Sequence, residues 1–292
     1  MAIRGVFVPK DTYPYVEEVP VEFDWFGGFA VAQKQRCATS LHLTFLARNT
    51  GAKPIEISGA SGYSLGQKLS AMNLRKWSRT ANSYVCLESA FQSSRIYVTS
   101  DNNRIGPLTQ YLKSDGKVAK SAVKKASQGI ICSEYLFDGM RFPVPDFHIS
   151  LFYDYLYLNA LLEDANRDVA LQLLTGGFNA FSDLATKALN TQARSCALFV
   201  SLSRLGLIDR VRDYNAFMEL FRVDLTRNDY AAPGAYNGAQ VLFPKHPLGV
   251  KCFSAIVPWH FTKDEVIRHH NACKGIVTMD NIHLAKQMGG YY

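Results

Sequence analysis

The stretch CLESAFQSSRIY, residues 86–97, decides how this chain is interpreted. Glu88, Gln92 and Arg95 are spaced i, i+4 and i+7, so a helix would place all three on one face. The neighbouring face is mostly apolar and includes Phe91. A carboxylate, an amide and a guanidinium beside an apolar face fit either a solvated helix surface or a ligand site. The spacing alone leaves both interpretations open.

The segments before this stretch predict short strands and a helix. Near the N-terminus, β-forming residues and prolines predict two strands, RGVFVP and YVEEVPVEFDWF. Apolar residues at helical spacing predict a helix in FAVAQKQRCATSLHLTFLARN. The piece LGQKLSAMNL, residues 65–74, is expected to be extended.

Turn signals and longer helical patterns follow in the second half. Asp138–Gly139 predicts a hairpin in SEYLFDGMRFPVP. SLFYDYLYLNALLEDANRDVALQLL predicts two helices with a break near residues 164–166, and NTQARSCALFVSLSRLGL predicts another, with Asn190 as N-cap and Gly206 as stop. We therefore predict an α+β, helix-rich fold. A single domain would cover residues 1–223, and residues 224–292 would form a C-terminal extension of unknown role.

Composition indicates anionic partners and a reducing compartment. The formal charge is +7 and the sequence pI is about 9.0, which favours nucleic acid or nucleotides but also fits many plain basic proteins. The six cysteines stand singly without a CxxC pair, so we expect free thiols and a cytoplasmic location. The N-terminal stretch is acidic and proline-containing where a signal peptide is apolar, and no apolar run is long enough for a bilayer. We expect no membrane partner.

Further polar groups fit either a ligand site or ordinary surface. Gln33 and Lys34 lie in the first predicted helix, and Asn73 interrupts an otherwise apolar stretch. Gln192 and Arg194 open a helix, where an amide and an arginine suit an anion as well as a cap. A run of lysines could follow a phosphate backbone or be simply solvated: residues 113, 117, 120, 124 and 125.

Several familiar sites are excluded by their motifs. The chain lacks GxGxxG and GxxxxGK[ST], so it has neither the dinucleotide fingerprint nor the P-loop. Potential zinc ligands gather in the predicted extension, but their spacing matches no standard finger or ribbon: Cys252, His260, His269, His270 and Cys273. We therefore expect no metal and no cofactor.

An ordered set of stretches connects the chain to one family. The chain resembles the NADAR proteins, in particular the branch found as antitoxins beside guanine-targeting DarT-type toxins. The resemblance covers roughly the first three quarters of the chain. The stretches that carry it are RGVFVP, WFGGFAVAQKQRCATSLH, LGQKLSAMNL, LESAFQSSRIY, FDGMRFPVP, FYDYLYLNAL and FSDLATKALNTQARSCALFVSLSRLGLID.

The resemblance implies an N-glycosidase-like, helix-rich fold that removes ADP-ribose from modified guanine bases in nucleic acid. The implied partners are ADP-ribose, ADP-ribosylated guanine in nucleic acid and a DarT-type toxin. Glu88 would stabilise positive charge at the anomeric carbon of the ribose. The residues expected around the ligand are Gln33, Lys34, Asn73, Phe91, Gln92, Lys120, Gln192 and Arg194, with Tyr97 beside Phe91 in the wall.

Two positions depart from the family pattern. The family's helix typically ends in a lysine that attacks the anomeric carbon, whereas Arg95 stands here, and a guanidinium cannot do so at neutral pH. Asp183, the third expected catalytic residue beside Glu88 and Arg95, is present, but its acidic companion is missing from the shortened segment that follows it. Lys34 or Lys120 could have taken over as nucleophile.

Three functions stay open at this level. The chain could be an active ADP-ribosyl-guanine glycohydrolase that uses another nucleophile, or direct attack by water guided by Glu88. It could instead be a catalytically degenerate module that binds ADP-ribose or a related nucleotide, as a sensor, sponge or immunity factor. It could also be a structural or interaction protein built on the same fold. The breadth of the motif set favours the glycohydrolase, with an antitoxin or anti-defence role.

Overall fold

The protein divides into two compact units. The computed structural model describes residues 1–28, 30–99, 101–127, 130, 132–143, 151–184, 191–221, 239–243 and 253–257, the last two ranges by their backbone. The first unit comprises Met1–Pro143 and Phe152–Arg212, and the second comprises Val144–Leu151 and Asp213–Tyr292. All residues predicted to form the site belong to the first unit.

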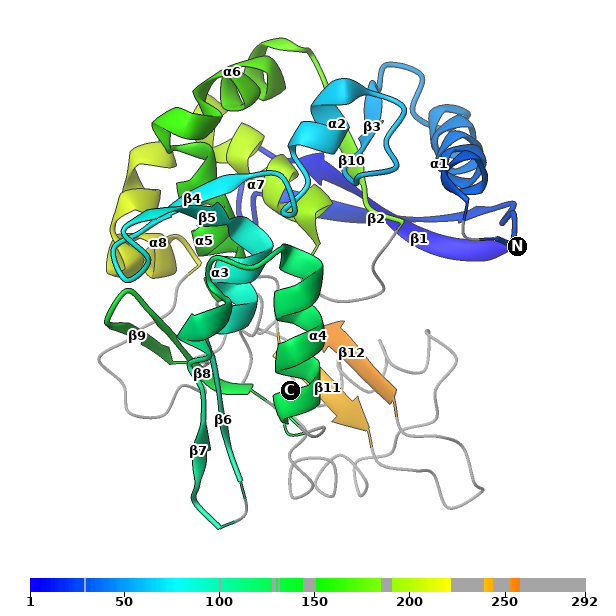
Figure 1. Ribbon diagram of the computed structural model, residues 1–292. Helices are drawn as coiled ribbons and strands as arrows, with labels where there is room; N and C mark the ends of the chain where they lie inside the picture. Colours follow the sequence, from blue (N-terminus) through cyan, green and yellow to red (C-terminus); the bar gives the residue numbers. More distant parts are fainter. Residues whose placement is uncertain are drawn as a thin grey trace. The chain divides into compact units, whose positions relative to one another are not determined.

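A four-stranded sheet in the order β2-β1-β10-β3 underlies the first unit (Figure 1). β1 (Ala2–Pro9) and β2 (Val16–Phe23) pair antiparallel along their whole length, which confirms the two predicted N-terminal strands. β10 (Ala180–Ser182) runs antiparallel to β1 and parallel to β3 (Pro54–Glu56), with Ser182 opposite Glu56. This register places the end of β10 beside the end of β3.

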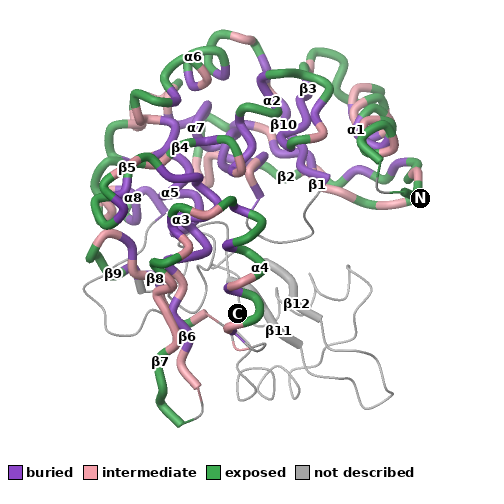
Figure 2. Tube along the Cα trace, in the orientation of Figure 1, coloured by how far each residue is buried: buried purple, intermediate pink, exposed green. Residues whose placement is uncertain are grey.

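Two helices pack on this sheet. α1 (Val31–Leu46) buries Cys37, Leu41 and Phe45, one helical turn apart, against the sheet, and exposes its opposite side. α7 (Gln192–Arg204) is buried from residue 193 to residue 202 and is almost wholly purple in Figure 2. Its N-cap is Thr191, whose side chain accepts from the Arg194 N–H at 3.1 Å, so the prediction of Asn190 as N-cap is wrong.

The opening stretch is a short helix between two strands. α3 (Leu87–Ser93) follows β5 (Ser83–Cys86) directly and ends before β6 (Arg95–Val98). β6 pairs with β8, with Arg95 opposite Tyr135, and its β-branched and aromatic residues suit that pairing. The prediction of one helical row is therefore correct for Glu88 and Gln92 and wrong for Arg95, which lies on a strand.

A second four-stranded sheet has the order β7-β6-β8-β9. It consists of β7 (Arg104–Ile105), β6, β8 (Cys132–Phe137) and β9 (Met140–Pro143). The predicted turn is confirmed between β8 and β9, where Asp138 and Gly139 both have positive φ, 51° and 83°. β4 (Arg75–Ser78) and β5 form a separate two-stranded ribbon.

The remaining helices of the first unit follow the sequence with one exception. α5 (Leu151–Leu161) and α6 (Arg167–Thr175) are separated by η2 (Asp164–Asn166), which confirms the predicted break. The exception is α2 (Ser64–Lys68), in a piece expected to be extended. Leu65 and Leu69 are both buried and lie one helical turn apart, so burial of this pair favours the helix. The other elements are η1 (Thr109–Tyr111), α4 (Gly116–Ser127) and η3 (Ile208–Arg212).

The second unit contains α8 (Tyr214–Leu220) and a hairpin of β11 (Ala239–Phe243) and β12 (Phe253–Val257). Asp213 caps α8 by accepting from the Ala216 N–H at 2.8 Å. The cysteines and histidines considered for zinc lie outside the described residues. Within the described ranges, no helix combines the length and the apolar character needed to cross a bilayer. The fold is α+β and rich in helices, as predicted.

Candidate active site

Glu88 is buried and held by two neighbours. Only 7% of Glu88 and 5% of Gln92 is exposed, so the solvated-surface interpretation of this pair is wrong. The Gln92 side-chain N–H donates to Glu88 Oε1 at 2.9 Å, one helical turn along α3. Lys120 Nζ on α4 lies 3.7 Å from the same oxygen. The structure thus brings together an acid, an amide and a lysine that the sequence separates.

A glycine permits this approach of α4 to α3. A Cβ atom at Gly116 would lie 2.6 Å from Met72 Sδ and 2.9 Å from Glu88 Cβ, which real contacts do not allow. Because Gly116 begins α4, Lys120 follows exactly one helical turn later, on the same side of the helix. Close packing at the glycine therefore positions the lysine at the carboxylate.

A second carboxylate, Asp183, is linked to the start of α3 through Gln192. Asp183 is 6% exposed and accepts from the Gln192 side-chain N–H at 3.2 Å. The Gln192 oxygen accepts from the Ala71 N–H at 2.6 Å, and the Ala71 carbonyl accepts from the Glu88 N–H at 2.9 Å. Gln192 therefore ties the loop after β10 to the helix that carries Glu88.

The two carboxylates act on one phenol. Burial, and after it the charges of Glu88 and Asp183, raise the pKa of Tyr153 well above its ordinary value. The Tyr153 ring meets Phe91 edge-on, with ring centroids 4.8 Å apart. An aromatic wall with two carboxylates nearby is an environment that can stabilise a developing cation on a bound sugar.

Glu56 is a site neighbour that the sequence did not reveal. Burial, and after it the charge of Asp183, raise the pKa of Glu56 to about 7. Its carboxylate accepts from the Leu184 N–H at 2.9 Å and from the Ser182 hydroxyl. His42 Nε2 lies 2.9 Å from that hydroxyl, and burial lowers the pKa of His42 to about 4. β3 thus places a second buried carboxylate near Asp183, and a lone glutamate in the apolar stretch PIEI, residues 54–57, was its only sequence signal.

Replacing Glu56 with glutamine should stabilise the protein at pH 8 and leave its stability unchanged near pH 4. The folded-state pKa of about 7 lies above the ordinary glutamate pKa of 4.5, so wild-type stability falls as pH rises between these values. Glutamine does not titrate, and its amide can donate to Ser182 where the protonated acid would. The gain in free energy of unfolding at pH 8 is up to about 3 kcal/mol. Urea unfolding at both pH values measures it, with exposed Glu22→Gln as control; equal gains at both pH values would contradict the prediction.

Arg95 belongs to the aromatic wall. Its guanidinium carbon lies 4.7 Å from the centroid of the Phe91 ring, and its buried Nε has no hydrogen-bond partner among the described residues. Phe91 also stacks on Tyr135, with centroids 5.5 Å apart, and Tyr97 is buried on the same strand as Arg95. Across the described residues no ion pair joins Arg95 to Glu88. Its expected catalytic role stays a prediction.

Arg194 and Asn73 make structural contacts. Arg194 is 4% exposed and donates to Asp154 Oδ2 at 3.0 Å, in an ion pair inside the core. Asn73 is exposed, and its amide donates to the Gln67 carbonyl at 2.7 Å. Neither contact involves Glu88 or Asp183, so ligand binding by these two residues stays a prediction.

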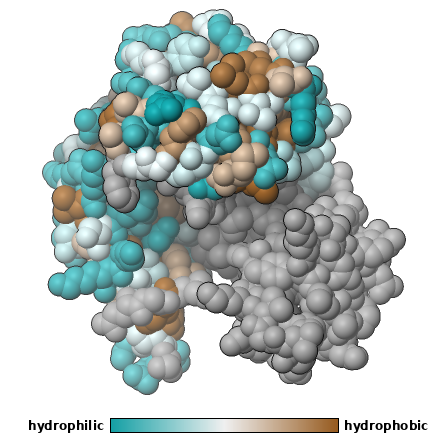
Figure 3. All heavy atoms as spheres, turned by 90° about the vertical axis from the view of Figure 1, so that its right-hand side faces the viewer, coloured by the Kyte–Doolittle hydropathy of each residue, from teal (hydrophilic) through white to brown (hydrophobic). Residues whose placement is uncertain are grey.

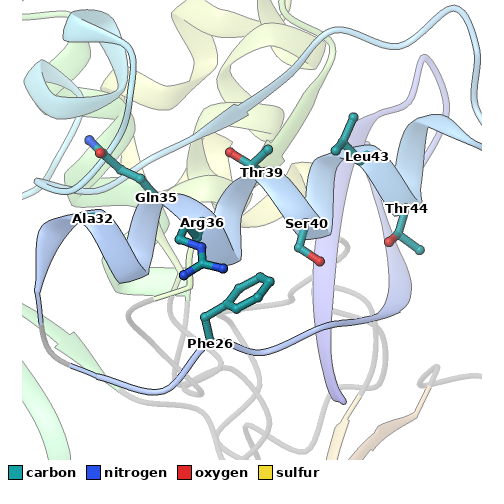
Figure 4. Close-up of a pocket in the computed structure, with 8 residues that line it drawn as sticks. All are labelled: Phe26, Ala32, Gln35, Arg36, Thr39, Ser40, Leu43 and Thr44. Atoms are coloured by element: carbon teal, nitrogen blue, oxygen red, sulfur yellow. The ribbon is translucent and has the colours of Figure 1, made fainter.

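Gln33 and Lys34 lie on α1 beside a groove. Gln33 is half-buried and Lys34 is exposed. The groove has a volume of about 600 Å³ and is lined by Phe26, Ala32, Gln35, Arg36, Thr39, Ser40, Leu43 and Thr44 (Figure 4). Within it, the Arg36 guanidinium carbon lies 4.3 Å from the centroid of the Phe26 ring. On the face at the right of Figure 1, brown apolar residues lie among teal ones (Figure 3). This groove does not contain the carboxylates of the site.

No group of three His, Cys, Asp or Glu side chains that could hold a metal occurs in the part of the chain the structure describes.

The model of the DarT1-associated NADAR antitoxins matches residues 2–231. The chain belongs to this family. No curated protein matches it. Glu88, Asp183 and Lys120 of this NADAR protein all lie within the matched residues, and the family supports an antitoxin role.

Proposed function

We propose that this NADAR protein hydrolyses the bond between ADP-ribose and a guanine base of nucleic acid, and that this repair is its antitoxin activity. The observation that carries the proposal is the buried Glu88 carboxylate, bound at Oε1 by Gln92 and approached by Lys120. A buried carboxylate with this support is suited to a reaction that develops positive charge. The family match supports the antitoxin part of the proposal.

The reaction assigned to the site is attack by water on the anomeric carbon. The water oxygen bonds to that carbon, the bond to the base nitrogen breaks with its electron pair on nitrogen, and the proton released by water ends on nitrogen. The products are ADP-ribose and unmodified guanine. Gln92 donates to Glu88 Oε1, and Lys120 Nζ lies near the same oxygen. We therefore assign the other oxygen, Oε2, to the ribose ring, where it stabilises the oxocarbenium-like transition state.

In this mechanism Lys120 acts as a cation. An amine must be neutral to attack the anomeric carbon, and neutral amines are favoured by desolvation. The Lys120 side chain is 63% exposed and lies beside the Glu88 carboxylate, so it lacks the desolvated setting in which a lysine acts as a nucleophile. We therefore assign it to the diphosphate of ADP-ribose, which lies beside the ribose.

Lys120→Ala should raise KM for the modified nucleic acid by about tenfold, while Lys120→Arg should remain close to the wild type, because only charge is required. Steady-state release of ADP-ribose measures both variants. Exposed Lys124→Ala on the same helix is the matched control. An inactive Lys120→Arg variant, together with a borohydride-trapped adduct at Lys120 in the wild type, would show an imine route instead.

The assay that tests the proposal is release of ADP-ribose from an oligonucleotide with ADP-ribosylated guanine. The wild type should turn over repeatedly, and borohydride should trap no adduct at Arg95. Calorimetry with ADP-ribose separates the alternatives if no turnover occurs. Binding of ADP-ribose without turnover would make the protein a nucleotide-binding module, and no heat at millimolar ADP-ribose would leave an interaction protein.

A further inference from the structure

The β4–β5 ribbon exposes a face that combines arginines with aromatic rings. Along β4 and the turn after it, Arg75, Trp77 and Arg79 are exposed, whereas Ser78 between them is buried. Trp77 lies directly opposite Tyr84 on β5, and the two rings meet edge to face with centroids 5.3 Å apart. Trp77 is 38% exposed and Tyr84 is 42% exposed. Both rings therefore present exposed aromatic surface that a flat ligand can contact.

The guanidinium groups of this face, those of Arg75 and Arg79, are not held in ion pairs within the described part of the chain. The Asp138 carboxylate accepts from the Ser78 hydroxyl at 2.8 Å and from the backbone N–H groups of Arg79 and Thr80 at 2.9 and 3.1 Å, and not from the Arg79 guanidinium. Lys76 on the other side of the strand pairs with Glu163. Two arginines therefore flank the ring pair with their charges available to an anion.

The ribbon leads directly into the candidate active site (Figure 1). Arg75 lies opposite Cys86, the last residue of β5, and Glu88 follows two residues later on α3. Hydrogen bonds fix this junction: the Leu87 N–H donates to the Leu74 carbonyl at 2.9 Å, and the Glu88 N–H donates to the Ala71 carbonyl at 2.9 Å. The exposed face and Glu88 are thus carried by consecutive elements of the chain, β5 and α3.

We propose that this face, formed by Arg75, Trp77, Arg79 and Tyr84, binds single-stranded nucleic acid, with bases stacked on the two rings and phosphates at the two arginines. Stacking on aromatic side chains and contacts from arginine are how proteins hold single strands without sequence preference. An acidic protein surface would use the arginines but not the exposed ring faces, and paired bases in a duplex could not reach them. The inference rests on the proposed function only for the statement that the bound strand carries the modified guanine.

The test is fluorescence anisotropy with a labelled, unmodified oligodeoxynucleotide of about 12 nucleotides, within the range that one such surface covers. Trp77→Ala with Tyr84→Ala should weaken binding by about a hundredfold, since each of the two lost stacking contacts is worth about tenfold. Trp77→Phe with Tyr84→Phe should retain most of the affinity. The matched control is Trp25→Ala, because Trp25 is 43% exposed and also has an arginine, Arg4, at 5.2 Å from its ring.

The arginines have their own readout. Arg75→Ala with Arg79→Ala should reduce the slope of log affinity against log salt by about 1.4, about 0.7 for each phosphate contact on a single strand. The control pair Arg36→Ala with Arg48→Ala should change the slope less. Arg75→Ala with Arg79→Ala leaves the packing of Trp77 on Tyr84 in place. Its salt dependence therefore tests the proposal even if the variant with both rings replaced by alanine does not fold.

Wild-type affinity in the ring and arginine variants alike would overturn the proposal. Equal affinity of the wild type for a duplex of the same sequence would also overturn it. The test stands apart from the proposed catalytic function, because the probe carries no ADP-ribose. ADP-ribosylated guanosine has no flanking nucleotides that could bind to the ribbon face. The Trp77 and Tyr84 variants should therefore hydrolyse this small substrate at the wild-type rate. If the wild type hydrolyses neither substrate, the proposed function fails while the binding result remains valid.

Discussion

Glu88→Ala should reduce the rate of guanine de-ADP-ribosylation by about a hundredfold or more. Loss of one preorganised group that stabilises charge in a transition state typically costs about 3 to 4 kcal/mol. Glu88 is buried and oriented by Gln92, so water cannot take its place with the same geometry. The loss should appear in kcat, since the carboxylate acts on charge that exists only in the transition state.

The measurement is single-turnover release of ADP-ribose from a modified oligonucleotide by the wild type, Glu88→Ala and Glu88→Gln. Glu88→Gln keeps the shape of the side chain and should lose nearly as much rate, because the negative charge is what acts. Glu22→Gln, an exposed glutamate on β2, is the matched control and should be unaffected. Robust turnover by Glu88→Ala would remove Glu88 from the mechanism.

Asp154→Ala should lower the free energy of unfolding by about 3 to 5 kcal/mol, the usual cost of breaking a buried ion pair from one side. Asp154 is 2% exposed and accepts from Arg194 at 3.0 Å and from the Ser195 hydroxyl. Burial raises the pKa of Asp154 to about 6 and lowers the pKa of Arg194, so each charge depends on the other. Removing the carboxylate takes away the larger of the two acidic charges that act on the buried guanidinium, the smaller being that of Glu18.

Urea unfolding at pH 7.5 measures this effect. Glu17→Ala removes the exposed partner of Lys10, 2.9 Å away, and should change stability by less than about 1 kcal/mol. Asp154→Leu combined with Arg194→Met should recover most of the lost stability, because apolar replacement of both partners removes the desolvation cost. A loss below about 1 kcal/mol in Asp154→Ala would show that the pair does not stabilise the core.

The sequence by itself determined the local elements and the family. Alternation and turn chemistry fixed β1, β2 and the hairpin at Asp138–Gly139, since both act within a few residues. Spacing of apolar residues fixed α1, α7 and the two helices around η2. The ordered motif set pointed to the family that matches residues 2–231. The i, i+4 spacing of Glu88 and Gln92 correctly placed these two residues on one helix face.

Tertiary structure alone decided the limits of the helices and the membership of the site. Arg95 lies on a strand and not on the helix because its backbone pairs with Tyr135 of β8. The secondary-structure propensity of the local sequence does not predict such a pairing. The segment from Ser64 to Lys68 became helical because the core buries Leu65 and, directly after the helix, Leu69. Lys120 met Glu88 because Gly116 let two helices approach, and Glu56 met Asp183 because β3 runs parallel to β10. These contacts join residues that lie far apart in the sequence. Their free energies depend on distance and burial in space, which no local sequence pattern encodes.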